Sequence, residues 1–230
     1  MRREPRQPAR GFMRPDVVDA DPASNLEWNR QRWGQAEGWS SYDRFGYRWS
    51  GGVQQTVGAL ARFTDEQFRP FTGGRDDLRI LEIAPGAGRF TAELIRYASE
   101  LCLLDLNEAA LDVCRQRFSY FPTPITYVVG SGTSFEGVPR DAAWDAVVSY
   151  DSMVHMHPDV IAGYVSALPS ILAPGGFAWL DHSGKGQRAS GHRSAMTDAL
   201  MRQLATDAGL EVVSQRFRND WDCISVLRRP

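Results

Sequence analysis

The chain has 230 residues, of which 43% are hydrophobic and 23% charged, and its formal net charge is −2. This composition is that of a globular protein large enough to bury a core without disulfide bonds, and the slight acidity argues against nucleic acid as a partner. No apolar run reaches the roughly 18 residues that span a membrane, and no secretory signal is recognisable. The cysteines lack the spacing of a metal site, so we expect a cytoplasmic protein with reduced thiols.

Two N-terminal segments differ from the rest of the sequence. Residues 1–25 interleave arginines with prolines, which disfavour a regular helix, and we expect a disordered leader there. Residues 26–75 combine a helical apolar pattern at 53–63 with the tryptophans Trp28, Trp33, Trp39 and Trp49. They predict a helical, aromatic lid segment that either packs as core or lines an acceptor pocket. Residues 76–230 are predicted to form one α/β domain.

From residue 78 onward, short apolar runs alternate with helical patterns. Strands are predicted at 78–84, 100–105, 125–129, 144–150 and 177–180, and helices at 88–98, 108–118, 158–172 and 195–208. The alternation predicts a parallel sheet with helices on both faces. Two further strand patterns, 210–217 and 223–227, are joined by a short polar turn and must pair antiparallel. We therefore predict a doubly wound, seven-stranded, mostly parallel α/β sheet with an antiparallel C-terminal hairpin.

The most informative stretch joins the first strand of this domain to its first helix. The run Ile80-Leu81-Glu82-Ile83 ends at Pro85-Gly86-Ala87-Gly88, and a helical pattern follows. Glycines tolerate positive φ and let the backbone approach a ligand closely, and a helix N-terminus attracts negative charge. The second strand ends in Asp105, about twenty residues downstream, where an acid is placed to bind ribose hydroxyls. Together these features predict a site for an adenosine-bearing cofactor.

The segment from Glu82 to Gly88 resembles the first motif of class I S-adenosylmethionine-dependent methyltransferases, an acid followed by alternating glycines, with Ala84 in place of the first glycine. The resemblance implies a Rossmann-like methyltransferase fold and S-adenosylmethionine as cofactor. It also implies that residues 84–88 face the methionine end, that Asp105 binds the ribose diol and that Leu106 lies beside the adenine. The expected cofactor residues are Glu82, Ala84, Gly86, Gly88, Asp105, Leu106, Ser131, Gly132, Thr133 and Tyr150.

Candidate residues for the acceptor follow the fourth and fifth strands. Ligands in open α/β sheets bind at the carboxyl ends of the strands, where this chain has Asp151, His155 and the pair Asp181-His182. Methyl transfer to a hydroxyl requires removal of its proton, so we assign catalysis to His155, Asp151 and His182, with His155 as general base. A structural, hydrogen-bonding histidine is the alternative for His155, and His157 is expected to cap the next helix.

Asp151, Asp181 and His182 are similar to the ligand set of metal-dependent O-methyltransferases of this fold, in which two acids and an amide chelate Mg²⁺. Mg²⁺ is therefore a second candidate cofactor, although a histidine is an unusual ligand for this ion. No residue is assigned as a dedicated metal ligand.

Beyond the cofactor motif, segments 105–108, 149–155, 181–183 and 222–226 resemble bacterial sugar and small-molecule O-methyltransferases of secondary metabolism. The resemblance implies methyl transfer to a hydroxyl of a small molecule, a sugar or a glycosylated natural product. An amine acceptor, as on an amino sugar, is the alternative. A nicotinamide-dependent oxidoreductase is a further rival, disfavoured by Thr91 at a position where a dinucleotide fingerprint has Gly or Ala. We expect a small-molecule acceptor, and neither nucleic acid nor membrane as partner; a homo-oligomer stays open.

Overall fold

The computed structural model describes residues 21–34, 57–186 and 193–230. Residues 1–20 of the expected leader lie outside the described residues, whereas residues 22–25 form the first turn of helix α2 (Pro22–Trp33). Asp21 caps this helix, because its carboxylate accepts a hydrogen bond from the Ser24 backbone at 2.8 Å. Trp39 and Trp49 of the expected lid segment also lie outside the described residues.

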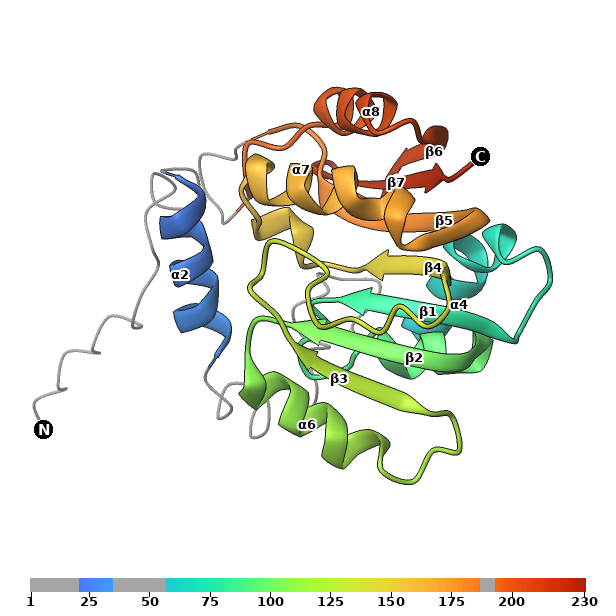
Figure 1. The fold of residues 1–230 in the computed structure, drawn as a ribbon. Helices are drawn as coiled ribbons and strands as arrows, with labels where there is room; N and C mark the ends of the chain where they lie inside the picture. The colour runs from blue at the N-terminus through green and yellow to red at the C-terminus, as the bar shows by residue number, and fades with distance from the viewer. Residues whose placement is uncertain (1–20, 35–56, 187–192) are drawn as a thin grey trace, which may run out of the picture.

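The strands of the described part of the chain form one seven-stranded sheet, in the order β3-β2-β1-β4-β5-β7-β6 (Figure 1). They are β1 (Leu78–Ile83), β2 (Ala98–Asp105), β3 (Ile125–Val129), β4 (Trp144–Ser149), β5 (Leu172–Ser183), β6 (Glu211–Phe217) and β7 (Asp222–Arg228). The pairs among β1 to β5 are parallel, and β7 pairs antiparallel with both β5 and β6. The predicted doubly wound, mostly parallel sheet with an antiparallel C-terminal hairpin is confirmed.

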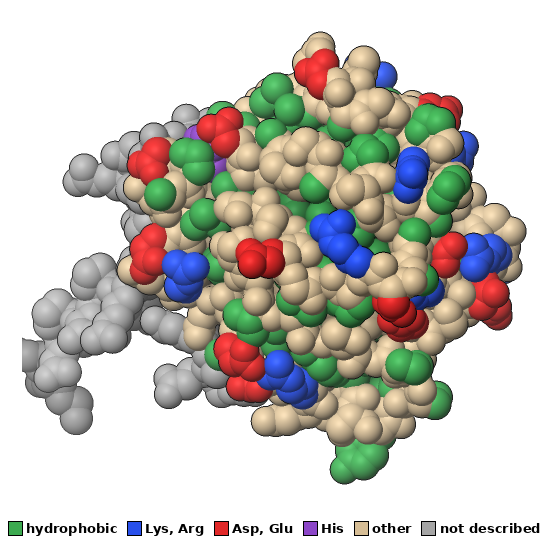
Figure 2. All heavy atoms as spheres, viewed as in Figure 1, with side chains coloured by type: hydrophobic (Ala, Val, Ile, Leu, Met, Phe, Trp, Pro, Cys, Tyr) green, Lys and Arg blue, Asp and Glu red, His purple; other side chains and the backbone are tan. Residues whose placement is uncertain are grey.

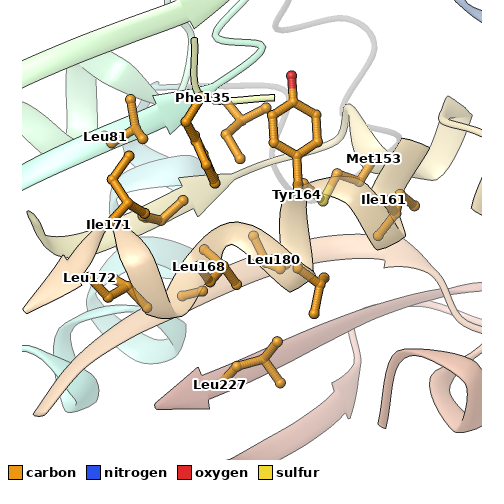
Figure 3. Packing of buried hydrophobic residues seen from close by; sticks show 14 of the residues in the cluster. Leu81, Phe135, Met153, Ile161, Tyr164, Leu168, Ile171, Leu172, Leu180 and Leu227 are labelled. Atoms are coloured by element: carbon orange, nitrogen blue, oxygen red, sulfur yellow. The ribbon is translucent and has the colours of Figure 1, made fainter. Parts of the chain in front are cut away.

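Helices cover both faces of the sheet, because successive strand residues alternate between the two faces. One face carries α7 (Pro158–Ala167) and α8 (Asp198–Asp207), and the other carries α4 (Val57–Gln67), α5 (Thr91–Leu94) and α6 (Glu108–Phe118). Short 3₁₀ helices join these elements: η2 (Arg69–Phe71), η3 (Ile95–Tyr97), η4 (Met153–His155) and η5 (Leu168–Ser170). Figure 3 shows the core on the α7 side, where strand residues meet helix residues, among them Leu81, Leu180, Leu227, Ile161, Tyr164 and Leu168.

Some element boundaries differ from the predicted ones for local reasons. The helix predicted at 88–98 is reduced to α5 and η3, because the turn after β1 extends to Phe90 and β2 already begins at Ala98, which pairs with Leu78. The fifth strand, predicted at 177–180, extends over the whole of β5 because it has a partner on each side, β4 and β7.

The order of the strands fixes where a ligand can bind. The chain begins the sheet at β1, runs outward to β2 and β3, and then returns to β4 on the other side of β1. The connections therefore diverge at the carboxyl ends of β1 and β4, which is where open α/β sheets bind ligands. Helix α2 stands across this edge of the sheet (Figure 1).

The surface carries charges of both signs. On the face shown in Figure 2, acidic and basic side chains are interspersed with apolar ones, and neither sign of charge dominates. Within the described residues, every helix is too short or too polar to cross a membrane.

Candidate active site

The turn after β1 has positive φ at three alternate positions. Ala84, Gly86 and Gly88 have φ values of 54°, 56° and 75°. Gly88 is also required for packing, because a Cβ there would lie 2.5 Å from the Phe118 ring and 3.1 Å from the Cys114 sulfur of α6. Ala84 carries a side chain in the left-handed region, which costs roughly 1–2 kcal/mol. Small residues alternate in this motif because every second position of the turn has a positive φ.

Two buried carboxyl groups lie next to this turn. Glu82 in β1 accepts a hydrogen bond from the Thr91 hydroxyl at 2.5 Å, and burial raises its pKa to about 8. Asp105 at the end of β2 accepts backbone hydrogen bonds from Gly86 at 3.2 Å and Asn107 at 2.9 Å. Burial raises the pKa of Asp105 to about 6 despite these donors. Near neutral pH Glu82 is therefore protonated, whereas Asp105 is ionised and keeps lone pairs for further donors.

The loop after β3 lies against α2. A Cβ at Gly132, whose φ is 87°, would lie 2.8 Å from Leu26 of α2 and 3.2 Å from Leu106. Ser131 and Thr133 on either side are exposed, and their hydroxyls lie 3.0 Å apart. The residues expected beside the adenine are therefore adjacent in space. Leu26 joins them, although its sequence context carries no specific signal for this site.

The segment after β4 is tied to the turn after β1. The Ser149 hydroxyl donates a hydrogen bond to the Ile83 carbonyl at 3.1 Å, and the Ser152 hydroxyl donates to the Ala84 carbonyl at 2.8 Å. These two bonds place the expected cofactor turn and the expected acceptor segment side by side.

Tyr150, an expected cofactor residue, is buried on the face that carries α4 and α5. Its ring stacks on Phe90 with centroids 4.5 Å apart and lies 6.2 Å from Trp179. The guanidinium carbons of Arg89 and Arg218 lie 5.0 Å and 5.3 Å from the ring centroid. Its buried hydroxyl has no hydrogen-bond partner among the described residues. The ring is thus part of the core.

Two arginines that no sequence pattern singles out bind the acids at the ends of β4 and β5. The carboxylate of Asp151 accepts hydrogen bonds from Arg89 at 2.8 Å and from Arg218 at 2.6 Å, and Arg218 also donates to Asp181 at 3.0 Å. Burial alone would raise the pKa of Asp151, but the charges of Arg218 and Arg89 hold it well below its ordinary value. Burial raises the pKa of Asp181 to about 7, against the opposing charge of Arg218. Asp151 is therefore the more acidic of the two carboxyl groups.

His155, the expected general base, is buried beside α2. Its ring centroid lies 5.4 Å from that of Trp33 and 6.1 Å from that of Trp28. Its carbonyl accepts a hydrogen bond from the Asn25 amide at 2.9 Å, and the oxygen of that amide accepts one from the His157 backbone at 3.0 Å. Asn25 thus fastens α2 to the segment that contains His155.

The two other histidines among the described residues, His157 and His182, have structural positions. Nδ1 of His157 accepts a hydrogen bond from the Asp159 backbone at 3.1 Å, which confirms the predicted cap of α7. His182 is fully buried, with Nδ1 2.7 Å from the Ser183 carbonyl and Nε2 2.7 Å from the Ser225 hydroxyl, and burial lowers its pKa to about 4. Both ring nitrogens of His182 are therefore already engaged.

The expected grouping of His182 with Asp151 and Asp181 is corrected by the structure. Neighbouring residues of a strand point to opposite faces, and β5 places Asp181 with Trp179 on the α4 side and His182 with Leu180 on the α7 side. The expected Mg²⁺ ligand set is not assembled, because the two carboxylates bind Arg218 instead. Over the described ranges, no group of three or more His, Cys, Asp or Glu residues could hold a metal ion.

Part of the chain matches a known protein family. Residues 80–176 match the family model described as methyltransferase domain. Magnesium protoporphyrin IX methyltransferase (ChlM) from Synechocystis PCC 6803 with bound S-adenosylhomocysteine is similar in structure, at 13% identity and a TM-score of 0.65 over 91% of this chain and 100% of that chain. N-methyltransferase NodS from Bradyrhizobium japonicum WM9 with S-adenosylhomocysteine has 17% identity and a TM-score of 0.64 over 90% and 99% of the two chains.

A third similar structure is an amino pentose methyltransferase from Micromonospora echinaspora involved in calicheamicin biosynthesis, at 16% identity and a TM-score of 0.58 over 74% of this chain and 92% of that chain. No curated protein sequence matches the chain significantly. The structural likenesses show the fold, and the matched segment contains both the glycine turn and Asp105. Residues 80–176 therefore match a methyltransferase domain, and the fold is that of solved S-adenosylmethionine-dependent methyltransferases.

Proposed function

We propose that this methyltransferase acts on a hydroxyl of a small polar molecule, a sugar or a glycosylated natural product. The observation that carries the proposal is the position of His155, buried next to Trp28 and Trp33 at the edge where the cofactor turn meets the acceptor segment. Aromatic side chains can cover the faces of a sugar ring and exclude water from it. The imidazole beside them is a group that can take a proton.

The residues near the turn fit the cofactor. Ionised Asp105 has lone pairs beyond those used by Gly86 and Asn107, so it can accept hydrogen bonds from both hydroxyls of a ribose. Leu26, Leu106 and Gly132 offer an apolar surface suited to a purine. When bound, S-adenosylmethionine supplies an electrophilic methyl group on its sulfonium. Of the expected lid segment, residues 26–75, α2 thus lies beside this surface, whereas Leu60 of α4 packs in the core of the expected cofactor domain, residues 76–230.

His155 and Asp151 have different tasks in this proposal. His155 removes the hydroxyl proton, and a positioned base of this kind contributes about 10²- to 10⁴-fold to the rate. Asp151 is a poor base, because Arg218 and Arg89 hold its pKa low, so its carboxylate accepts a hydrogen bond from the substrate and orients it. Correct orientation is worth roughly 7–11 kcal/mol when the reacting groups are well aligned.

An amine acceptor is the second candidate, and one observation favours it. The carboxylate of Asp151 can accept a hydrogen bond from an amine as well as from a hydroxyl. A structural neighbour is an amino pentose methyltransferase. An amine also needs less help from a base, so the two candidates differ in their dependence on His155.

Incubation with S-adenosylmethionine and paired panels of glycosides and amino sugars tests the proposal, with methylated products detected by mass spectrometry. We expect methylation of a hydroxyl. His155→Gln is expected to lower kcat by about 10²- to 10⁴-fold while the affinity for S-adenosylhomocysteine, measured by calorimetry, stays unchanged. His157→Asn is the matched control, because asparagine still caps α7, and its kcat should equal that of the wild type. Methylation of amino sugars alone, at full rate in His155→Gln, would replace the hydroxyl by the amine.

A further inference from the structure

Arg218 lies in the turn between β6 and β7, and its side chain is only 4% exposed. Its guanidinium donates hydrogen bonds to three carboxylates. The acceptors are Asp151 after β4, at 2.6 Å, Asp181 in β5, at 3.0 Å, and Asp222 in β7, at 3.1 Å. One side chain from the C-terminal hairpin therefore joins the acceptor segment to the strands beside it.

Asp151 is fixed at three points by its surroundings. Its backbone N–H donates to Asp181 at 2.9 Å, one carboxylate oxygen accepts from Arg218, and the other accepts from Arg89 at 2.8 Å. Its φ of 55° lies in the left-handed region, which aspartate adopts more readily than most residues with a side chain. These contacts together fix both the backbone and the carboxylate of Asp151.

The charges around Asp151 explain why the hairpin turn needs an arginine. Three buried carboxylates without opposite charges would be strongly destabilising. Arg218 supplies the largest opposing charge at Asp151 and keeps its pKa below the ordinary value. Arg218 therefore acts directly on the ionisation of Asp151, and it acts on the Asp151 backbone through Asp181, which accepts the Asp151 N–H. The charged and titratable groups of this cluster are Arg89, Arg193, Arg218, Asp151, Asp181, Asp222 and Tyr150.

We propose that Arg218 is a positioning residue of the acceptor site, which holds the backbone and carboxylate of Asp151 in one orientation toward the substrate. This inference rests on the proposed function, in which Asp151 orients the acceptor. A carboxylate bound at both oxygens cannot rotate, so an acceptor that hydrogen-bonds to it meets a single geometry. Methyl transfer depends on such alignment, and a misplacement of about 1 Å can cost about 10²-fold in rate.

Arg193 provides an internal control in the same cluster. It donates to both oxygens of Asp222, at 2.6 Å and 2.7 Å, and so binds the neighbour of Arg218 rather than Asp151. Replacing it disturbs the same ionic cluster without removing a hydrogen bond from Asp151.

Arg218→Lys is the decisive variant. Lysine keeps the charge, but one ammonium cannot span three carboxylates as the planar guanidinium does. We expect kcat to fall about 10- to 100-fold, with the dissociation constant for S-adenosylhomocysteine within about twofold of the wild type. Carbon-13 NMR of the protein without acceptor should show the pKa of the Asp151 carboxyl moving up toward its ordinary value. Arg193→Lys should leave kcat and this pKa unchanged.

A double-mutant cycle separates positioning from general stability. If Arg218 acts through Asp151, Arg218→Lys changes kcat by less than about twofold in an Asp151→Asn background. An equal loss of kcat in both backgrounds, or an unchanged pKa of Asp151 in Arg218→Lys, would overturn the proposal. A variant that is less stable but has full kcat when folded would overturn it too. The proposed function fails separately, if the wild-type enzyme methylates no hydroxyl. The NMR measurement of the Asp151 pKa uses no acceptor and does not depend on that result.

Discussion

Asp181 and His182 are adjacent in β5, and their side chains lie on opposite faces of the sheet. Asp181 binds Arg218 at the edge where Asp151 lies. His182 is enclosed on the α7 side, where its ring nitrogens meet the Ser183 carbonyl and the Ser225 hydroxyl. The pair thus contributes one residue to the candidate acceptor site and one residue to the core.

His182→Gln is therefore expected to leave kcat unchanged and to alter the pH dependence of stability. The pKa of His182 is lowered to about 4 in the folded protein, so below an ordinary value of about 6.5 the unfolded chain binds a proton that the folded chain does not. Above about pH 6.5 His182 is neutral in both states, and the stability that depends on its neutral form is complete. As the pH falls from about 6.5 toward 4, the unfolded chain takes up a proton and the free energy of unfolding decreases. The wild type should lose about 2 kcal/mol relative to the variant between about pH 7.5 and about pH 5, measured by chemical denaturation. A loss of kcat at full stability would instead place His182 in the catalytic site.

Ala84→Gly should stabilise the protein. Ala84 has a φ of 54°, and glycine adopts this region without the steric cost that a Cβ brings. We expect the free energy of unfolding to rise by about 1 kcal/mol, measured in urea. Ala87→Gly in the same turn is the control, because Ala87 has no positive φ, and this change should lower stability by about 0.5–1 kcal/mol. Equal effects of the two changes would contradict the left-handed backbone at Ala84.

Gly88→Ala should destabilise for two separable reasons. The new Cβ would lie 2.5 Å from the Phe118 ring, and the φ of 75° disfavours any side chain. Together these effects should cost about 3 kcal/mol. In a Phe118→Leu background the steric part is relieved, so the same change should cost only about 1–2 kcal/mol. Additive losses in the double-mutant cycle would show that the ring of Phe118 is not the obstacle.

Asn25→Leu should loosen α2 from the edge of the sheet. The buried amide of Asn25 satisfies the His157 N–H and shares the His155 carbonyl with the Asn29 amide, which donates to it at 3.3 Å. A buried polar group that loses its partner costs about 1–3 kcal/mol. Hydrogen exchange of the amides in residues 21–34 should become faster, and kcat/KM should fall because Trp28 and Trp33 leave their positions. Arg30→Ala on the exposed side of the helix, where the side chain is 50% exposed, should change neither. Unaltered exchange in Asn25→Leu would show that other contacts fix α2.

The fold and the cofactor turn could be predicted because their signals are local. Apolar runs and short turns specify the strands and the antiparallel hairpin, and the spacing from Gly86 to Asp105 places an acid beside the glycine turn. The cap at His157 could be predicted from Pro158 alone. Each of these sequence patterns spans only a few residues or one strand-helix unit, so it can be recognised without knowledge of the tertiary structure.

The acceptor side could not be predicted in the same way, because its contacts join distant segments. Arg218 meets Asp151 across 67 positions of the sequence, and an arginine in a polar turn has the appearance of a solvated residue. The alternation of strand residues alone separates His182 from Asp181, because neighbours in a strand point to opposite faces of the sheet. Leu26 reaches the candidate adenine surface only through the tertiary position of α2.

The claim on which this account depends most is that Asp105 binds the ribose of the cofactor as an ionised carboxylate. Calorimetry with S-adenosylhomocysteine at a series of pH values tests it. Burial sets the pKa of Asp105 at about 6 in the free protein, and ribose hydroxyls favour its charged form. Affinity should therefore fall as the pH drops below about 6, with proton release on binding there, and Asp105→Asn should weaken binding by about 10²-fold at higher pH and abolish this pH dependence. Absence of binding by the wild type, or equally tight binding by Asp105→Asn with the same pH dependence, would contradict the account.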